Sequence, residues 1–264
     1  MDDLNLLVRA TLQIYADALR KGTAALLRHI WIVGLLPTYT LLLQVVSGLA
    51  VNLGFAGGFL VFLAIAACAS SFLTVIGEAV AHGRVRFDEL AQTFGQFFSR
   101  LISVFFMFWI VKLLLGMIVS ANPNMMWLEI FVNIAIFLVF NSIPELIYQG
   151  RSDGMAILQD AIQFTRDNLV EWLLPLGLVL APFFLIGTQM GFAVMARFGV
   201  QNGLGLVIGL VATWLPFSGA AQLLAATAIA SVAIVWVMLF RGFLFRALNE
   251  SGRRQRVFAS RARG

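Results

Sequence analysis

The chain has 264 residues, of which 61% are hydrophobic and only 12% are charged, and its formal net charge at pH 7 is +5. A soluble domain has about 25% charged residues, and 24 Phe and 6 Trp are too many for one water-soluble core of this size. The composition excludes an ordinary soluble protein and predicts an all-α, polytopic transmembrane helical bundle.

The N-terminal segment, residues 3–28, is predicted to form an amphipathic helix. Its less polar positions recur at three- to four-residue spacing: Leu4, Leu7, Thr11, Ile14 and Ala18. Because residues 1–28 hold three aspartates and no apolar run occurs before residue 30, this is not a cleavable signal peptide. We expect this helix to rest on the cytoplasmic leaflet.

Six apolar segments have roughly the 20 residues that a helix needs to cross a bilayer: residues 30–50, 57–80, 101–120, 127–148, 169–194 and 220–240. The last apolar stretch already begins at residue 204 and is too long for a single crossing. Because Pro-Phe-Ser-Gly at 216–219 interrupts it, we expect residues 204–215 to lie in the outer interface or dip into it. A seventh span would place the arginine-rich tail outside.

Positive charge predicts the orientation of the spans. Sixteen of the 18 Lys and Arg lie in the N-terminal segment, in the second-to-third and fourth-to-fifth connections, or after the sixth span. Six spans put these regions on one face, which the positive-inside rule makes cytoplasmic. Residues 1–248 would form one membrane domain and 249–264 a basic cytoplasmic tail. Five tail arginines are expected to contact anionic lipids: Arg253, Arg254, Arg256, Arg261 and Arg263.

An internal repeat aligns residues 76–84 with residues 143–151 at an offset of 67. The same offset pairs Glu78 with Glu145 and Arg84 with Arg151, and it brings two Gln and a Phe into register further along. Each copy is interpreted as a span, a glutamate, a Gly-Arg turn, an in-plane cytoplasmic amphipathic helix (86–98 or 154–168) and a span. A third copy, split between the sixth span and the N-terminal helix, is compatible with this pattern.

Residues 150–161, 164–168 and Trp172 carry a family resemblance, through the sequences Gly-Arg-Ser-Asp-Gly and Phe-Thr-Arg-Asp-Asn. They resemble the bacterial YciC-like membrane proteins and are similar to the membrane domain that precedes some glycerophosphoryl diester phosphodiesterases. The resemblance implies a six-span bundle with Gly-bounded amphipathic cytoplasmic loops in the bacterial cytoplasmic (inner) membrane. It implies little chemistry, and the sequence has no counterpart of the phosphodiesterase domain.

Glu78 and Glu145, near the inner ends of the second and fourth spans, are the first candidate sites. Ionisable groups at membrane depth are costly and often functional, so the two acids could bind a cation or a basic residue of a partner. The structural alternative, which we favour, pairs Glu78 with Arg84 and Glu145 with Arg151 and so fixes each turn into the in-plane helix.

Lys112 is the only cation clearly inside the membrane, near the middle of the third span. A cation at this depth needs a compensating partner, and Glu129 is expected to lie too close to the outer interface to provide it. We expect a buried hydrogen bond to a neutral side chain, with snorkelling or a contact to substrate or lipid phosphate as alternatives. The neutral candidates are Asn133, Asn141, Gln189 and Gln222.

No catalytic, cofactor or metal site is expected, because the two histidines lie on different segments and nucleotide and metal motifs are missing. The chain is interpreted as a non-enzymatic accessory or scaffolding subunit of a membrane complex, or as an organiser of membrane lipids. The alternative is a transporter or permease-like subunit for a lipid or another amphiphile. Expected partners are membrane lipids, other complex subunits or a cytoplasmic protein, and not nucleic acid.

Overall fold

The computed structural model describes residues 2–85, 87–150, 152–186, 208, 211–212, 215–216 and 218–250. This part of the chain is helical and contains no strand, so the predicted all-α class is confirmed. The longer helices are α1 (Asp2–Arg28), α2 (Leu35–Ala50), α3 (Phe55–Ala81), α5 (Phe98–Ala121), α6 (Met126–Phe140), α7 (Ile143–Gln149), α8 (Met155–Asp167), α9 (Leu169–Ile186) and α12 (Ala220–Glu250). Short helices precede or connect them: η1 (Ile30–Gly34), η2 (Val51–Leu53), η3 (Phe87–Glu89), α4 (Leu90–Thr93) and η4 (Pro123–Met125).

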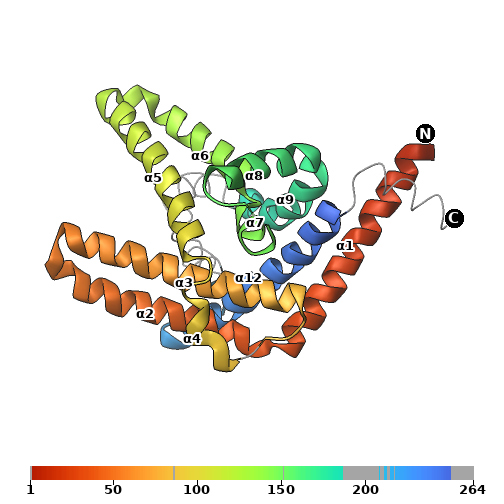
Figure 1. The fold of residues 1–264 in the computed structure, drawn as a ribbon, viewed down its shortest axis with the longest axis horizontal. Helices are drawn as coiled ribbons and strands as arrows, with labels where there is room; N and C mark the ends of the chain where they lie inside the picture. The colour runs from red at the N-terminus through yellow and green to blue at the C-terminus, as the bar shows by residue number, and fades with distance from the viewer. Residues whose placement is uncertain are drawn as a thin grey trace.

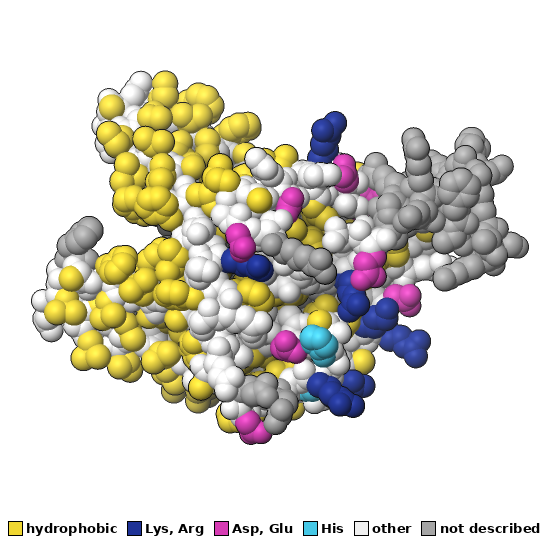
Figure 2. Space-filling model, viewed as in Figure 1, with side chains coloured by type: hydrophobic (Ala, Val, Ile, Leu, Met, Phe, Trp, Pro, Cys, Tyr) yellow, Lys and Arg dark blue, Asp and Glu magenta, His cyan; other side chains and the backbone are white. Residues whose placement is uncertain are grey.

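Two apolar hairpins, α2–α3 and α5–α6, project to one side of the molecule (Figure 1). Large hydrophobic side chains on them are more than half exposed, among them Phe59, Trp109 and Leu114. Figure 2 shows hydrophobic side chains over both hairpins, whereas charged side chains gather on the half that holds α1, α8 and α12. This distribution is expected if lipid surrounds the hairpins and water contacts the charged half.

Within the described residues, five helices are long and apolar enough to cross a membrane. They are Ile30–Leu53, Ala56–Ala81, Leu90–Ala121, Met126–Gln149 and Ala220–Glu250, and they contain five of the six predicted spans. The other predicted span, 169–194, begins with α9, but residues 187–194 lie outside the described part. So does most of the segment expected at the interface, 204–215. The number of crossings therefore stays a prediction.

The N-terminal helix α1 packs antiparallel against α12 (Figure 1). Trp236 Nε1 donates a hydrogen bond to Thr23 Oγ1 at 3.0 Å, and Ala18 is only 3% exposed. A Cβ atom added to Gly22 would lie 3.0 Å from the backbone nitrogen of Phe240, so glycine permits the close approach. The apolar face that was expected to rest on lipid is thus partly covered by α12. Either lipid or a neighbouring helix can cover the apolar stripe of an amphipathic helix.

The last helix does not stop at residue 240, where the sixth predicted span ends, but continues to Glu250. Arg241 and Gly242 therefore lie within a helix rather than at a turn. Glycine weakens a helix by about 1 kcal/mol relative to alanine. Burial of the following turns offsets this cost, because Leu244 and Phe245 are each 1% exposed.

The two predicted in-plane helices differ in the structure. The second is continuous, as α8, and buries Ile157 and Ala161. The first, expected over 86–98, is wrong as a single helix: the chain forms only η3, α4 and a turn before α5 begins. Hydroxyl groups of α3 hold this turn, since Ser71 Oγ lies 2.5 Å from Thr93 Oγ1 and Ser70 Oγ accepts a hydrogen bond from the Phe97 backbone at 2.9 Å. Thr93 Oγ1 also donates to the Leu90 carbonyl at 2.6 Å, a local bond of the kind that competes with helical hydrogen bonds.

Gly242 is predicted not to tolerate a methyl group. An added Cβ would lie 2.7 Å from Tyr148 Oη in α7 and 2.7 Å from Val80 Cγ2 in α3, and overpacking costs about 1–3 kcal/mol. Gly242→Ala should lower the melting temperature of the detergent-solubilised protein. Gly116→Ala in α5 is the matched control, because its added Cβ meets no atom within 4 Å; it should melt no lower than wild type. Equal melting of the two variants would contradict this packing.

Candidate functional site

A buried ion pair joins α7 to α12. Glu145 is fully buried, and both of its oxygens accept hydrogen bonds from Arg241, from Nε at 2.8 Å and from Nη2 at 2.9 Å. Arg241 Nη1 also donates to Asn141 Oδ1 at 2.7 Å, and Nη2 donates to the Asn141 main-chain carbonyl. The guanidinium lies 4.8 Å from the centroid of the Trp172 ring. These contacts engage both edges and one face of the guanidinium.

A helix break in the fourth predicted span positions this pair. α6 ends at Phe140, and α7 begins at Ile143 with Pro144 in its first turn. Proline has no N–H to donate to the carbonyl of Phe140, four residues earlier, so the helical ladder is interrupted. Asn141, at the break, turns its main-chain and side-chain oxygens to Arg241. The break supplies acceptors where an unpaired buried polar group would be costly.

The geometry suits a structural connection. Removing a carboxylate and a guanidinium from water costs several kcal/mol per ion, and close bidentate pairing is needed to offset that cost. Gln149 Nε2 adds a second bond between the same two helices, donating to the Gly242 carbonyl at 3.0 Å. Since both Glu145 oxygens are engaged, the pair holds α7 on α12 and presents no open carboxylate.

The expected pairing of each glutamate with the arginine of its own repeat is not what the structure shows. Glu78 Oε2 lies 2.9 Å from Nδ1 of His82, one helical turn later; the His82 side chain is largely exposed and that of Glu78 is partly exposed. Arg84 is exposed and forms no ion pair with a described residue. Glu145 binds Arg241, and Arg151 lies outside the described residues. The two acids thus differ in burial and partner, and the repeat itself stays a prediction.

Lys112 has an acidic partner, contrary to the expectation of a neutral one. Its Nζ lies 4.0 Å from Glu129 Oε1 across the α5–α6 hairpin, and both side chains are partly exposed. The long Lys112 side chain reaches toward the first turn of α6. The expectation of a neutral partner was based on the depths of Lys112 and Glu129 along straight spans and did not include this reach. Asn141 is engaged by Arg241, and Gln222 Nε2 donates to the Ala212 carbonyl at 2.8 Å.

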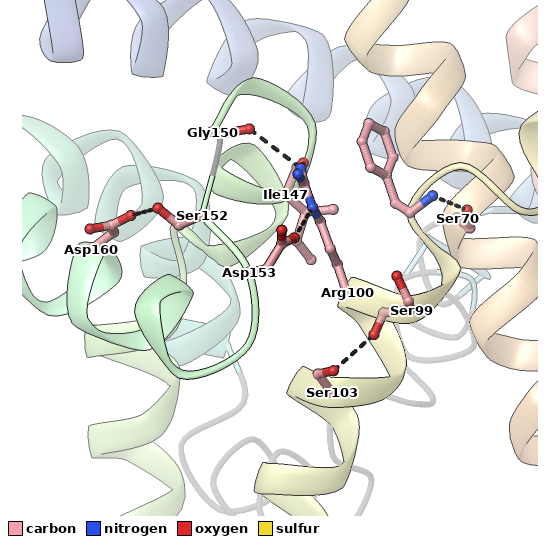
Figure 3. Close-up of polar contacts among 10 residues, drawn as sticks. Ser70, Ser99, Arg100, Ser103, Ile147, Gly150, Ser152, Asp153 and Asp160 are labelled. Atoms are coloured by element: carbon pink, nitrogen blue, oxygen red, sulfur yellow. Dashed lines mark hydrogen bonds and ion pairs between the residues drawn. The ribbon is translucent and has the colours of Figure 1, made fainter.

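Arg100, at the start of α5, is a connection that the sequence did not indicate (Figure 3). Its Nε donates to the carboxylate of Asp153, and its Nη1 donates to the main-chain carbonyls of Ile147 at 3.0 Å and Gly150 at 3.4 Å. Arg100 thereby ties α5 to the end of α7 and the loop before α8. From the sequence, Arg100 was only one of the positive charges that predict the orientation of the spans. Its partners could not be predicted, because they lie far along the chain.

No group of three or more His, Cys, Asp or Glu that could hold a metal ion occurs among the residues that the structure describes. The single cysteine, Cys68, is a free thiol buried in α3. All five tail arginines expected to contact lipid belong to residues 251–264, outside the described part.

Comparisons with protein-family models, with curated proteins and with solved structures find no match for this chain. The family resemblance at residues 150–172 therefore stays a prediction.

Proposed function

We propose that this chain is a non-enzymatic integral membrane protein of the bacterial cytoplasmic membrane, with six spans and both termini in the cytoplasm. In this proposal it is an accessory or scaffolding subunit of a membrane complex, or it organises membrane lipids. The supporting observation is the separation of two apolar hairpins from one charged half (Figure 2). We call the charged half, formed by α1, α8 and residues 241–250 of α12, the platform. Lipid would hold the hairpins while the platform faces water.

Polar contacts between distant segments brace the platform. Besides the Glu145–Arg241 pair, Tyr15 Oη of α1 donates to the main-chain carbonyl of Glu171 in α9 at 2.7 Å. A rigid surface loses little conformational freedom when a partner binds, which favours docking. A transport cycle must move helices apart. The cost of breaking the buried Glu145–Arg241 pair would oppose the separation of α7 from α12.

A transporter or permease-like subunit for a lipid or another amphiphile is the second candidate. It is favoured by an apolar groove of about 530 Å³ along α12. The groove is lined by Leu26, Ala228, Ile229, Val232, Ala233 and Trp236. It would suit an acyl chain, but its exposed lining is wholly apolar and offers nothing to a headgroup. We therefore prefer the scaffolding role.

Purification in mild detergent, with mass spectrometry of the proteins and lipids recovered, tests the proposal. The platform variant Arg20→Glu/Arg166→Glu changes two exposed arginines, and Asn52→Glu/Asn122→Glu adds charge at the hairpin tips as the control. We expect a stoichiometric partner protein with wild type and with the control, and its loss with the platform variant. Liposomes that contain the pure protein should show no accelerated lipid flipping. Flipping that depends on the protein would contradict the scaffolding role and support transport.

A further inference from the structure

A basic hollow lies where the end of α1 meets the end of α3. Its volume is about 190 Å³, and its cationic side comprises Lys21 and Arg28 of α1, followed by His29. The opposite side is apolar, with Ala79 of α3 and Phe243 of α12. Lys21 and Arg28 are seven residues apart, or two helical turns, and therefore point to the same side of α1. The hollow combines two cations with an apolar wall.

Gly83, two residues after the end of α3, positions Arg28 and His29. Gly83 has φ +63°, a conformation that favours glycine, and its carbonyl accepts hydrogen bonds from His29 Nε2 at 3.1 Å and from Arg28 Nη1 at 3.4 Å. A guanidinium has five N–H donors. The bond to the Gly83 carbonyl is the single hydrogen bond that the Arg28 side chain makes with a described residue. The remaining donors of Arg28 are available to a ligand, while His29 acts as a positioning residue.

Nearby acids leave the two cations without a counter-charge. Asp17, one turn before Lys21, forms no ion pair with it among the described contacts, although both side chains are exposed. Glu78, at the end of α3, is engaged by His82, and Glu250 of α12 is engaged by Arg246. Neither Lys21 nor Arg28 pairs with an acid in the part of the chain that the structure describes. Two uncompensated cations in one hollow favour an anionic ligand.

In the membrane placement proposed above, the hollow lies at the depth where the spans leave the hydrocarbon. The α3 span ends at Ala81, and the first candidate span begins at Ile30, so both boundaries flank the hollow. Basic pockets between spans at a cytoplasmic surface bind anionic lipid headgroups, and arginine matches the geometry of a phosphate. We propose that Lys21 and Arg28 bind the phosphate of an anionic phospholipid headgroup. The proposal rests on the membrane placement argued above, but not on the scaffolding role.

Lipid binding by the full-length protein in detergent tests this site. Phosphatidylglycerol, phosphatidylcholine and inorganic phosphate are added separately, and binding is followed by the shift in melting temperature and by lipid adducts in native mass spectrometry. Each charge-assisted hydrogen bond lost should weaken binding by roughly tenfold, so Lys21→Gln/Arg28→Gln should bind phosphatidylglycerol at least tenfold more weakly. Arg9→Gln/Arg20→Gln removes the same charge from α1 outside the hollow and should bind like wild type. If the double variant fails to fold, Lys21→Gln alone should still weaken binding.

Equal phosphatidylglycerol affinity for wild type and the hollow variants would overturn the proposal. Equal stabilisation by phosphatidylcholine would also overturn it, because binding would then not depend on the net charge of the headgroup. Equal stabilisation by inorganic phosphate would overturn it as well, because binding would then not require a lipid. Failure of the scaffolding role is distinguishable. Lipid flipping in liposomes with phosphatidylglycerol still bound at this hollow would overturn scaffolding and leave the site intact, whereas loss of the site would leave the partner protein in place.

Discussion

Replacing Glu145 with glutamine should lower the free energy of unfolding by about 3–5 kcal/mol, the usual cost of leaving one buried charge without its partner. The side chain is fully buried, and its oxygens are engaged by Arg241 at 2.8 and 2.9 Å. Glutamine keeps the size and one acceptor but no longer neutralises the guanidinium. Thermal unfolding of the purified protein in detergent, read by circular dichroism, would measure the change.

Glu78→Gln is the matched control, since Glu78 occupies the equivalent position of the predicted repeat but is partly exposed and, among the described residues, forms its ion pair with His82. An exposed pair contributes about 0–1 kcal/mol, so this variant should melt close to wild type. The double variant Glu145→Leu/Arg241→Met should regain much of the loss, because apolar residues of similar volume can replace a buried pair. Equal destabilisation by Glu145→Gln and Glu78→Gln would show that the pair does not hold α7 on α12.

Phe245→Ala should have an effect of similar size, about 3–5 kcal/mol, as expected for removal of a large side chain from a packed core. Phe245 is 1% exposed, and its ring centroid lies 4.4 Å from that of Phe164 in α8 and 6.0 Å from that of Trp172 in α9. The substitution leaves a cavity between α8, α9 and α12. The same melting measurement would detect it.

Phe106→Ala in α5 serves as the control for Phe245. Phe106 is 53% exposed on a hairpin and stacks on Trp109, so detergent fills the space that the ring leaves. The free energy of unfolding should fall by no more than the contribution of one aromatic pair, about 0.5–1.5 kcal/mol. A larger effect at Phe106 than at Phe245 would place the stabilising core in the hairpins instead of beneath the platform.

Hydropathy was sufficient for the helix class and for the five helices that are long and apolar enough to cross a membrane, because a span requires about 20 apolar residues wherever it packs. It missed the break at Asn141 because the segment around Pro144 stays apolar on average while its helical ladder is interrupted. It also treated 86–98 as one helix. The stripe there is real, but hydroxyls of Ser70 and Ser71, far back in the sequence, hold the chain in a turn.

The partner of Glu145 could not be predicted, because contact between α7 and α12 depends on how the helices pack. The repeat pointed to Arg151 through local spacing, yet the carboxylate is reached by Arg241, 96 residues away. The same limit applies to α1. Its apolar spacing is equally compatible with lipid and with a neighbouring helix, whereas the close approach at Gly22 and the Trp236–Thr23 hydrogen bond show that α12 covers it. Local patterns predict elements, while pairings between distant residues depend on tertiary packing.

Labelling of single cysteines in intact cells tests the central claim most directly, that the hairpins cross the membrane and the platform lies in the cytoplasm. With Cys68→Ser as background, Asn52→Cys and Asn122→Cys place a thiol at each hairpin tip, and Asp17→Cys and Gln159→Cys place one on the platform; all four positions are exposed. A membrane-impermeant maleimide should label the tip cysteines in intact cells and the platform cysteines only after lysis. Labelling of Asp17→Cys or Gln159→Cys in intact cells would contradict the account.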